Sequence, residues 1–229
     1  FATYGVHMKY LAKDEIEAFP ETEIADKPGS PGTITYNRVR IVYEKTGEFV
    51  FLSHLTLMKY LERLIRKAGI RFKCTEGYTP RIKIVSLPPL PVYAAGLEEV
   101  VELFVDAALG EQEILAQLKQ AAAPEGFKFK SLRMSNDIPP LSRDLHFITY
   151  EVSGENLRSH VDEIAPYLVD TDFVAFTDKC LSVKIDYSRQ GQERWGKIYR
   201  VMDPEKKQTR YLTRTQVTFK SRGDHDISH

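Results

Sequence analysis

One order of secondary-structure patterns constrains the fold more strongly than any single motif, because it recurs along the chain. From residue 36 to residue 135, hydrophobic periodicity and turn residues predict strand, helix, strand, strand, helix, strand. This is the split βαβ order, in which two helices pack on one face of a four-stranded antiparallel sheet. The sequence therefore favours a ferredoxin-like domain in this region.

The best-defined element of this pattern is a helix over residues 54–68. Its apolar side chains recur at three- and four-residue steps, which places them on one face. Ser53 can cap the first turn, and Gly69 follows the last turn, where a left-handed backbone favours a residue without Cβ. The apolar positions are Leu55, Met58, Leu61, Ile65 and Ala68.

The other elements of the first half are strands and one further helix. A run that begins at Arg38 alternates apolar and polar side chains, and a turn at residues 45–47 leads into a second extended run. Prolines at 88, 89 and 91 end a later strand. The expected strands are 38–44, 48–52, 70–74, 81–87, 98–106 and 127–134, and the expected helix is 111–123.

The second half repeats the order without a clear helix before its last strand. Strands are expected at 145–153, 172–177, 181–187 and 211–219, and a helix at 155–168. We therefore predict an α+β protein of two tandem ferredoxin-like (split βαβ) halves, the second incomplete or irregular. The expected organisation is an N-terminal helix and linker at 1–35, the first half at 36–135, the second half at 142–220 and a flexible tail at 221–229.

Composition and cysteine usage exclude several classes of protein. Of the 229 residues, 42% are hydrophobic and 28% are charged, which is typical of a globular chain. Cys74 and Cys180 form no CxxC or Cys/His cluster, so the sequence indicates no disulfide framework, metal site or cofactor in this chain. No apolar run is long enough to span a membrane, and no signal peptide is recognisable. We expect a cytoplasmic protein.

The formal net charge is zero, but the charges are segregated along the chain. Residues 53–83 hold eight Lys/Arg against Glu62 and Glu76. Residues 189–222 hold ten basic residues against three acids, and residues 97–126 hold seven acids and one Lys. Segregation of this kind indicates local electrostatic surfaces that the net charge conceals. The sequence thus predicts two basic stretches and one acidic stretch.

Basic residues recur at four- and three-residue steps on the 54–68 helix, opposite its apolar stripe, so their side chains project together. Such a ridge suits nucleic acid. The alternative is a solvated helix face on which Glu62 pairs with Arg66 one turn away. The ridge consists of Lys59, Arg63, Arg66 and Lys67.

A loop between two expected strands extends this basic character. Basic groups neutralise phosphates, an aromatic ring can stack on a base, glycine lets a backbone approach closely, and proline stiffens the exit. Single-stranded or looped RNA is the partner that this mixture suits, although glycine and proline also serve plain turns. The RNA-binding candidates in this segment are Glu76, Gly77, Tyr78, Pro80, Arg81 and Lys83, with Arg71 and Lys73 beside them.

Catalytic chemistry has one weak candidate. His54 follows Ser53 at the start of the helix, where an imidazole could meet phosphate or carry a proton. The alternative is a capping or packing histidine. No Ser/His/Asp set, Walker loop, GxGxxG or HExxH is readable.

The second basic stretch combines cations with the single tryptophan of the chain, Trp195. It suits either a nucleic-acid loop or a flexible charged hairpin with a packed tryptophan. Arg214, on the last expected strand, is a further RNA-binding candidate and could point across the sheet toward the first half. The other basic residues near Trp195 are Arg189, Arg194, Lys197 and Arg200.

Several segments of the first half match one family pattern. They are Phe51-Leu-Ser-His-Leu-Thr-Leu-Met58, Leu61-Glu-Arg63, Arg66-Lys-Ala-Gly69, Glu76-Gly-Tyr-Thr-Pro-Arg81 and Ser86-Leu-Pro-Pro-Leu-Pro91. On these segments, residues 36–135 resemble the radical-SAM-linked domain of unknown function. Arg214-Thr215 is similar to that family's closing R-T. The chain departs from the pattern at Thr56, where Asp is usual, and at Tyr78 and Thr79.

The resemblance implies an accessory role. Members occur fused to, or encoded beside, radical SAM enzymes of the cobalamin-dependent type. The iron–sulfur cluster, S-adenosylmethionine and cobalamin would belong to that partner. We therefore expect an RNA-binding or substrate-presenting domain without catalytic activity of its own, acting on tRNA or rRNA. The alternatives are a stand-alone RNA-processing or RNA-modifying enzyme and a protein-docking module that does not contact RNA.

Overall fold

The computed structural model describes residues 35–76, 78, 80–121, 125–154, 157–177, 179–202 and 211–220. The chain divides into two compact units, residues 1–32 and residues 33–229, and the described residues all belong to the second. The helix and linker expected at 1–35 lie outside the described residues except for Thr35, and the tail expected at 221–229 lies wholly outside them.

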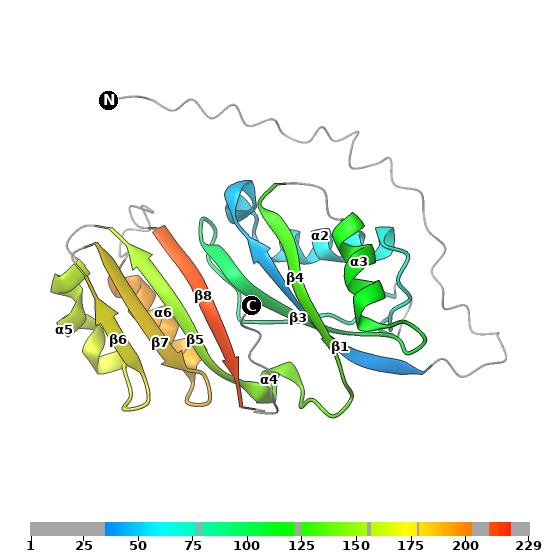
Figure 1. Ribbon diagram of the computed structural model, residues 1–229. Helices are drawn as coiled ribbons and strands as arrows, with labels where there is room; N and C mark the ends of the chain where they lie inside the picture. The colour runs from blue at the N-terminus through cyan, green and yellow to red at the C-terminus, as the bar shows by residue number, and fades with distance from the viewer. Residues whose placement is uncertain are drawn as a thin grey trace, which may run out of the picture. The chain divides into compact units, whose positions relative to one another are not determined.

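The first half contains the strands and helices of one split βαβ unit, and its helices α2 and α3 lie beside its strands (Figure 1). Its second strand is reduced to isolated bridges at Phe72 and Cys74. The elements are β1 (Tyr36–Lys45), the 3-10 helix η1 (Gly47–Phe51), α2 (His54–Lys67), β2 (Val85–Ser86), β3 (Ala95–Asp106), α3 (Glu111–Ala121) and β4 (Phe127–Met134).

The second half contains a complete unit of the same kind, which follows the short helix α4 (Leu141–Asp144). Its first helix is broken into η2 (Leu157–His160), α5 (Val161–Ile164) and η3 (Ala165–Tyr167). Its second helix is the continuous α6 (Gly191–Met202). The strands are β5 (Leu145–Ser153), β6 (Phe173–Phe176), β7 (Cys180–Asp186) and β8 (Tyr211–Phe219).

All the described strands form one mixed sheet in the order β4-β1-β3-β8-β5-β7-β6, with β2 paired to β3 off this path. The order β8-β5-β7-β6 is that of a ferredoxin-like unit, and β4-β1-β3 matches its first three positions. Because the second strand of the first half is so short, one end of β3 is left open along that edge. There β8 pairs with β3 in parallel, at Ala95↔Thr213 and Gly96↔Arg214. The protein is thus an α+β protein of two ferredoxin-like halves.

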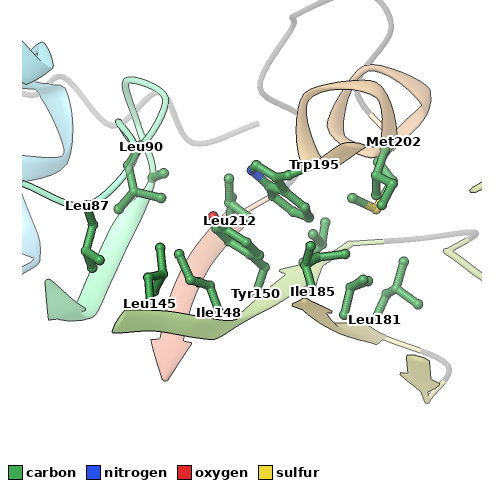
Figure 2. Packing of buried hydrophobic residues seen from close by; sticks show 14 of the residues in the cluster. Leu87, Leu90, Leu145, Ile148, Tyr150, Leu181, Ile185, Trp195, Met202 and Leu212 are labelled. Carbon is green, nitrogen blue, oxygen red and sulfur yellow. The ribbon is translucent and has the colours of Figure 1, made fainter. Parts of the chain in front are cut away.

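Two hydrophobic clusters form the cores of the two halves. One lies between α2, α3 and the odd-numbered side chains of β1 and β3, including Ile41 and Leu103. The other joins β5, β7 and α6 (Figure 2). It also includes Val42 and Val100 of the first half. In that cluster the rings of Tyr150 and Trp195 stack with centroids 3.7 Å apart. The central part of β1 is therefore buried on both faces.

A buried ion network ties the connection between the halves to β1. Arg40 Nη1 lies 2.5 Å from Asp144 of α4, and its Nε lies 3.3 Å from Glu102 of β3. Glu102 in turn accepts a hydrogen bond of 3.0 Å from the Leu141 backbone. Charges this deeply buried are tolerated when they are paired. The segment that joins the two halves is consequently held on the sheet.

Three expectations about the elements are wrong. The helix α6 occupies the region expected to lack one, because Trp195, Ile198 and Met202 share a buried face amid charged residues. The extended run expected at 48–52 is the 3-10 helix η1. On α2, Leu55 is 74% exposed, whereas Leu61 and Ile65 are buried as expected, together with Leu57 and Leu64. The broken first helix of the second half fits the expectation of irregularity.

Candidate functional site

The helix α2 has defined ends and presents two cations to solvent. The Ser53 hydroxyl accepts a hydrogen bond of 3.2 Å from the Thr56 backbone at its start, and Gly69 adopts a φ of +70° after its end. Lys59 and Arg63 are exposed one turn apart. Neither side chain makes a hydrogen bond or ion pair among the described residues. Both charges are therefore available to a partner.

The other two cations of the predicted ridge serve the fold. Arg66 Nη2 lies 2.9 Å from Glu62, and its guanidinium lies 5.2 Å from the Phe72 ring centroid. Lys67 Nζ donates to the Ala121 carbonyl at 3.2 Å, at the end of α3. Pairing of Glu62 with Arg66, the alternative considered for this helix face, is thus present. The ridge therefore offers a partner two cations, Lys59 and Arg63, rather than the four that the sequence suggested.

The segment 71–84 is a short hairpin whose two faces differ. Cys74 bridges Ile82, and Lys83 N donates to Lys73 O at 3.1 Å. Opposed residues of an antiparallel pair share a face, and successive residues alternate between faces. Ile82 is 6% exposed and faces inward, so the neighbouring positions face outward. Those outward positions carry Arg71, Lys73, Arg81 and Lys83, all exposed.

The turn of this hairpin carries the exposed aromatic ring. Tyr78 is fully exposed, Glu76 is exposed, and Pro80 is half-buried. Gly77 lies outside the described residues. The predicted candidates therefore lie on one exposed hairpin that follows directly after α2. We call Lys59, Arg63, Arg71, Lys73, Arg81 and Lys83 the basic surface. The only acid near one of them among the described ion pairs is Asp106, 3.8 Å from Arg71.

Arg214 does not belong to this surface. It points toward the first half, as its strand position suggested, but it is 0% exposed. Its Nη1 donates to both carboxylate oxygens of Glu99 on β3, at 2.9 and 3.0 Å, and its Nη2 donates to the Pro88 carbonyl at 2.6 Å. The prediction that Arg214 contacts RNA is wrong for a side chain this deeply buried; it joins β8 to β3 instead.

Gly96 explains how Glu99 reaches Arg214. A Cβ at Gly96 would lie only 2.6 Å from the Glu99 side chain, so this carboxylate lies over a position that must lack a side chain. In the sheet, Gly96 is opposite Lys45 on β1 and opposite Arg214 on β8. Glu99 therefore lies between two cations. We call Lys45, Glu99 and Arg214 the buried row.

The charges of the buried row shift each other's protonation. Burial lowers the pKa of Lys45, while Glu99 opposes that shift. Burial raises the pKa of Glu99, and Arg214 and Lys45 oppose the rise. Lys45 is 2% exposed and makes no hydrogen bond or ion pair among the described residues, whereas both oxygens of Glu99 accept from Arg214. The row thus holds more basic groups than acidic ones.

His54 lies beside this row. It begins α2, is half-buried, and its Nε2 is 3.4 Å from the Ser86 hydroxyl. Burial lowers its pKa, and the charges of Lys45 and Arg214 lower it further. The positive charges of Lys45 and Arg214 therefore favour the neutral form of the His54 imidazole. Thr56, where the resembled pattern has Asp, lies in the same first turn, and its hydroxyl is 2.9 Å from Ser53 Oγ.

The second basic stretch differs because most of its cations are paired. Arg194 binds Asp172 and donates to the Asp186 carbonyl at 2.7 Å, and Lys197 lies 2.8 Å from Glu193. Arg194 and Lys197 belong to the helix α6, where the sequence suggested a nucleic-acid loop or a flexible charged hairpin. Trp195 is packed, as the hairpin alternative proposed. An open groove of about 1010 Å³ lies between the start of α6, the 86–89 segment and α4.

Sequence reasoning missed Lys45, Gly96 and Glu99, because only the pairing of β1, β3 and β8 brings them together. Within the described ranges, no group of three His, Cys, Asp or Glu side chains could hold a metal ion. None of the helices in the described part of the chain is long and apolar enough to cross a membrane.

Comparison with known proteins identifies the family. Among solved structures, the chain is similar at a low level to a crystallised unknown protein from Galdieria sulphuraria (11% identity, TM-score 0.29, 81% of this chain and 99% of that chain). It is similar at the same level to the regulatory subunit of aspartate kinase from Thermus flavus (12% identity, TM-score 0.27, 74% of this chain and 94% of that chain). Neither likeness bears on function. No curated protein matches. The family DUF2344, uncharacterized proteins conserved in bacteria, matches residues 38–192, and the chain belongs to this family.

Proposed function

We propose that this chain is a cytoplasmic RNA-binding domain that presents tRNA or rRNA to a radical SAM enzyme. The observation that carries the proposal is the basic surface, whose cations are exposed on α2 and on the outward face of the neighbouring hairpin. Phosphate contacts from Lys and Arg supply most of the affinity in sequence-independent nucleic-acid binding.

The hairpin turn supports RNA rather than duplex DNA as the partner. Tyr78 is fully exposed beside four outward cations, so its ring is free to stack on an unpaired base. Recognition of single-stranded and looped RNA combines aromatic stacking with backbone neutralisation. Tyr78 thus supplies the contact that distinguishes an unpaired nucleotide from a stacked one.

The radical SAM partner enters the proposal through the resemblance of residues 36–135 to radical-SAM-linked domains. In this arrangement the partner supplies the iron–sulfur cluster, S-adenosylmethionine and, in the cobalamin-dependent type, cobalamin. The chain supplies a binding surface. A domain of this kind has no need of catalytic activity of its own.

Filter binding with tRNA and rRNA fragments tests the proposal. The variant pair is K59E/R63E on α2 against K128E/K130E on β4, which changes the net charge equally. Lys128 and Lys130 are exposed on β4, and β1 and β3 separate this strand from the hairpin, whose Phe72 bridges Val105 of β3. We expect RNA affinity to fall at least tenfold in K59E/R63E and less than threefold in K128E/K130E.

Two outcomes would contradict the proposal. One is an absence of RNA binding by the full chain at low salt. The other is an equal loss in both variants, which would indicate unspecific attraction. Salt-sensitive capture of the radical SAM protein in the absence of RNA, together with either outcome, would favour a docking module instead.

A further inference from the structure

The open groove beside α6 has a wall that packing within the fold does not explain. Gln192, Gly196 and Arg200 line the groove at four-residue steps, so they lie along one face of the helix. The other face of α6 packs Trp195 and Ile198 into the hydrophobic core. The helix therefore presents a second, solvent-facing surface to the groove.

Gly196 leaves open space in the middle of this wall. It lies in the interior of α6, where glycine destabilises a helix relative to most other residues. A Cβ at this position would meet nothing within 4 Å, and the φ of Gly196 does not lie in the left-handed region. Neither packing nor backbone conformation requires a glycine here. Its effect is to let a ligand approach the helix backbone closely.

The two side chains that flank Gly196 are free to bind a ligand. Gln192 and Arg200 are exposed, and neither makes a hydrogen bond or ion pair among the described residues. A glutamine amide offers a donor and an acceptor that match the edge of a base, and a guanidinium binds phosphate. The two residues are separated by about 12 Å along the helix axis. This separation is comparable to the length of a nucleoside monophosphate from base edge to phosphate.

The other walls of the groove are apolar and held in place. Leu87 and Leu145 line the groove and also belong to the hydrophobic cluster of Figure 2. Tyr187 lines it as well, and its hydroxyl is 2.6 Å from the Tyr150 hydroxyl. A Cβ at Gly191 would lie 2.9 Å from the Tyr187 ring, so the start of α6 holds this ring closely. A fixed aromatic ring suits base stacking, because binding does not have to order it.

The groove adjoins the basic surface. Lys83 belongs to that surface, and Ser86 lines the groove. Three residues of chain span at most about 11 Å, which limits the distance between the two Cα atoms. A single RNA strand bound at the hairpin is therefore able to reach the groove within a few nucleotides.

We propose that this groove binds one unpaired nucleotide of the presented RNA, with its base at Tyr187 and Gln192, its sugar over Gly196 and its phosphate at Arg200. The proposal rests on the proposed function for the identity of the polymer. The basic surface contacts phosphates without reading sequence, whereas an amide at a base edge favours particular bases, adenine above all. The groove thus gives the chain a preference for where along an RNA it binds.

Calorimetric titration of the full chain tests the proposal, and ¹⁵N NMR spectra locate the site. The probes are adenosine 5′-monophosphate, uridine 5′-monophosphate, adenosine and inorganic phosphate. The reporter is the Gly196 amide signal, which is assigned by its absence from Gly196→Ala. We expect the adenosine monophosphate to shift this signal and to bind at least tenfold more tightly than adenosine or phosphate. We also expect it to bind at least threefold more tightly than the uridine monophosphate.

Three variants separate the parts of the groove. Gly196→Leu fills the open space, so we expect it to weaken binding of the adenosine monophosphate at least tenfold. Its urea midpoint should be no lower than that of wild type, because leucine favours a helix more than glycine does. Arg200→Gln should lower the affinity for the monophosphate to that for adenosine. Gln192→Leu should remove the preference for adenine over uracil. Lys128→Gln, which removes one exposed charge on β4, is the control and should bind like wild type.

Failure of this proposal is distinguishable from failure of the proposed function. No shift of the Gly196 amide at millimolar adenosine monophosphate, or unchanged affinity in Gly196→Leu, would overturn the groove even if K59E/R63E loses RNA. Equal affinity for phosphate and the monophosphate would overturn the nucleotide as the ligand. A shift of Gly196 with the radical SAM protein and none with the monophosphate would assign the groove to that protein instead. Conversely, selective binding of the monophosphate supports the groove even if the chain binds no polymeric RNA.

Discussion

The two basic stretches of this chain resemble each other in sequence and differ in structure. In residues 53–83, two of the eight Lys/Arg side chains, Arg66 and Arg71, lie near a carboxylate among the described residues. In residues 189–220, four of the six described Lys/Arg side chains do so. The first stretch therefore leaves its charge available at the surface, whereas the second uses much of its charge within the fold. A local count of charges does not separate these cases.

The physical reason is the setting of each stretch. In the first half, the hairpin of residues 71–84 replaces a regular second strand, and alternation directs its cations outward. In the second half, α6 packs against β7, and Arg194 reaches Asp172, whose side chain is 1% exposed. Arg214 lies on a strand between two others. Substitutions in the second stretch should therefore cost stability, and those in the first should cost binding.

The largest expected effect is on Arg214. Replacement by Met leaves Glu99 charged and buried without its partner, so we expect the free energy of unfolding in urea to fall by about 3–5 kcal/mol. The double variant E99Q/R214M removes both charges and should recover part of the loss. A loss below about 1 kcal/mol in Arg214→Met would mean that the buried pair does not join β3 to β8 as described.

Arg194 should show the next largest effect. Replacement by Met removes hydrogen bonds to Asp172 and to the Asp186 carbonyl, and we expect a loss of about 2–3 kcal/mol, as for hydrogen bonds to charged groups. Arg200→Met on the same helix is the control, because Arg200 is exposed and makes no such contact among the described residues. Equal unfolding midpoints for the two variants would contradict the assignment.

The double variant K59E/R63E should hardly change stability. Both side chains are exposed and without partners in the described residues, so we expect a change within about 0.5 kcal/mol in the same urea titration. This neutrality makes any loss of RNA affinity interpretable. A loss similar to that of Arg194→Met would show that these cations contribute to the fold, and the contrast between the stretches would disappear.

The smallest effect concerns pH. Burial, Lys45 and Arg214 lower the pKa of His54 in the folded protein, so the unfolded chain binds its proton more readily. This residue therefore reduces stability as the pH falls below about 6.5, its unfolded value, toward the lower folded pKa. Unfolding of wild type and His54→Gln between pH 7.5 and 5.5 measures it. A steeper decline in His54→Gln than in wild type would contradict the sign.

Much of the fold could be predicted from alternation. The strands expected at 127–134, 145–153 and 211–219 match β4, β5 and β8 residue for residue, because each combines alternating side chains with clear turn residues. The helix α6 escaped detection because Arg194, Lys197 and Arg200 interrupt its apolar positions. Its amphipathic period becomes evident only once Trp195 is known to pack on Tyr150.

Likewise, one part of the candidate site could be predicted from the sequence and another part could not. The cations of α2 could be placed on one face from helical spacing, and those of the hairpin from their position beside a turn. The buried row could not, because it depends on contacts such as that between Glu99 and Arg214, which are 115 residues apart. A local pattern does not specify which strand of one half pairs with which strand of the other.

The salt dependence of RNA binding tests the central claim most directly. With six phosphate contacts at the basic surface, the slope of log affinity against log salt should be about −4 for single-stranded RNA, and K59E/R63E should reduce its magnitude by about 1.4. The control K128E/K130E should leave the slope unchanged. A slope near zero in wild type, or the same slope in K59E/R63E as in wild type, would show that the free cations of the first stretch do not bind RNA.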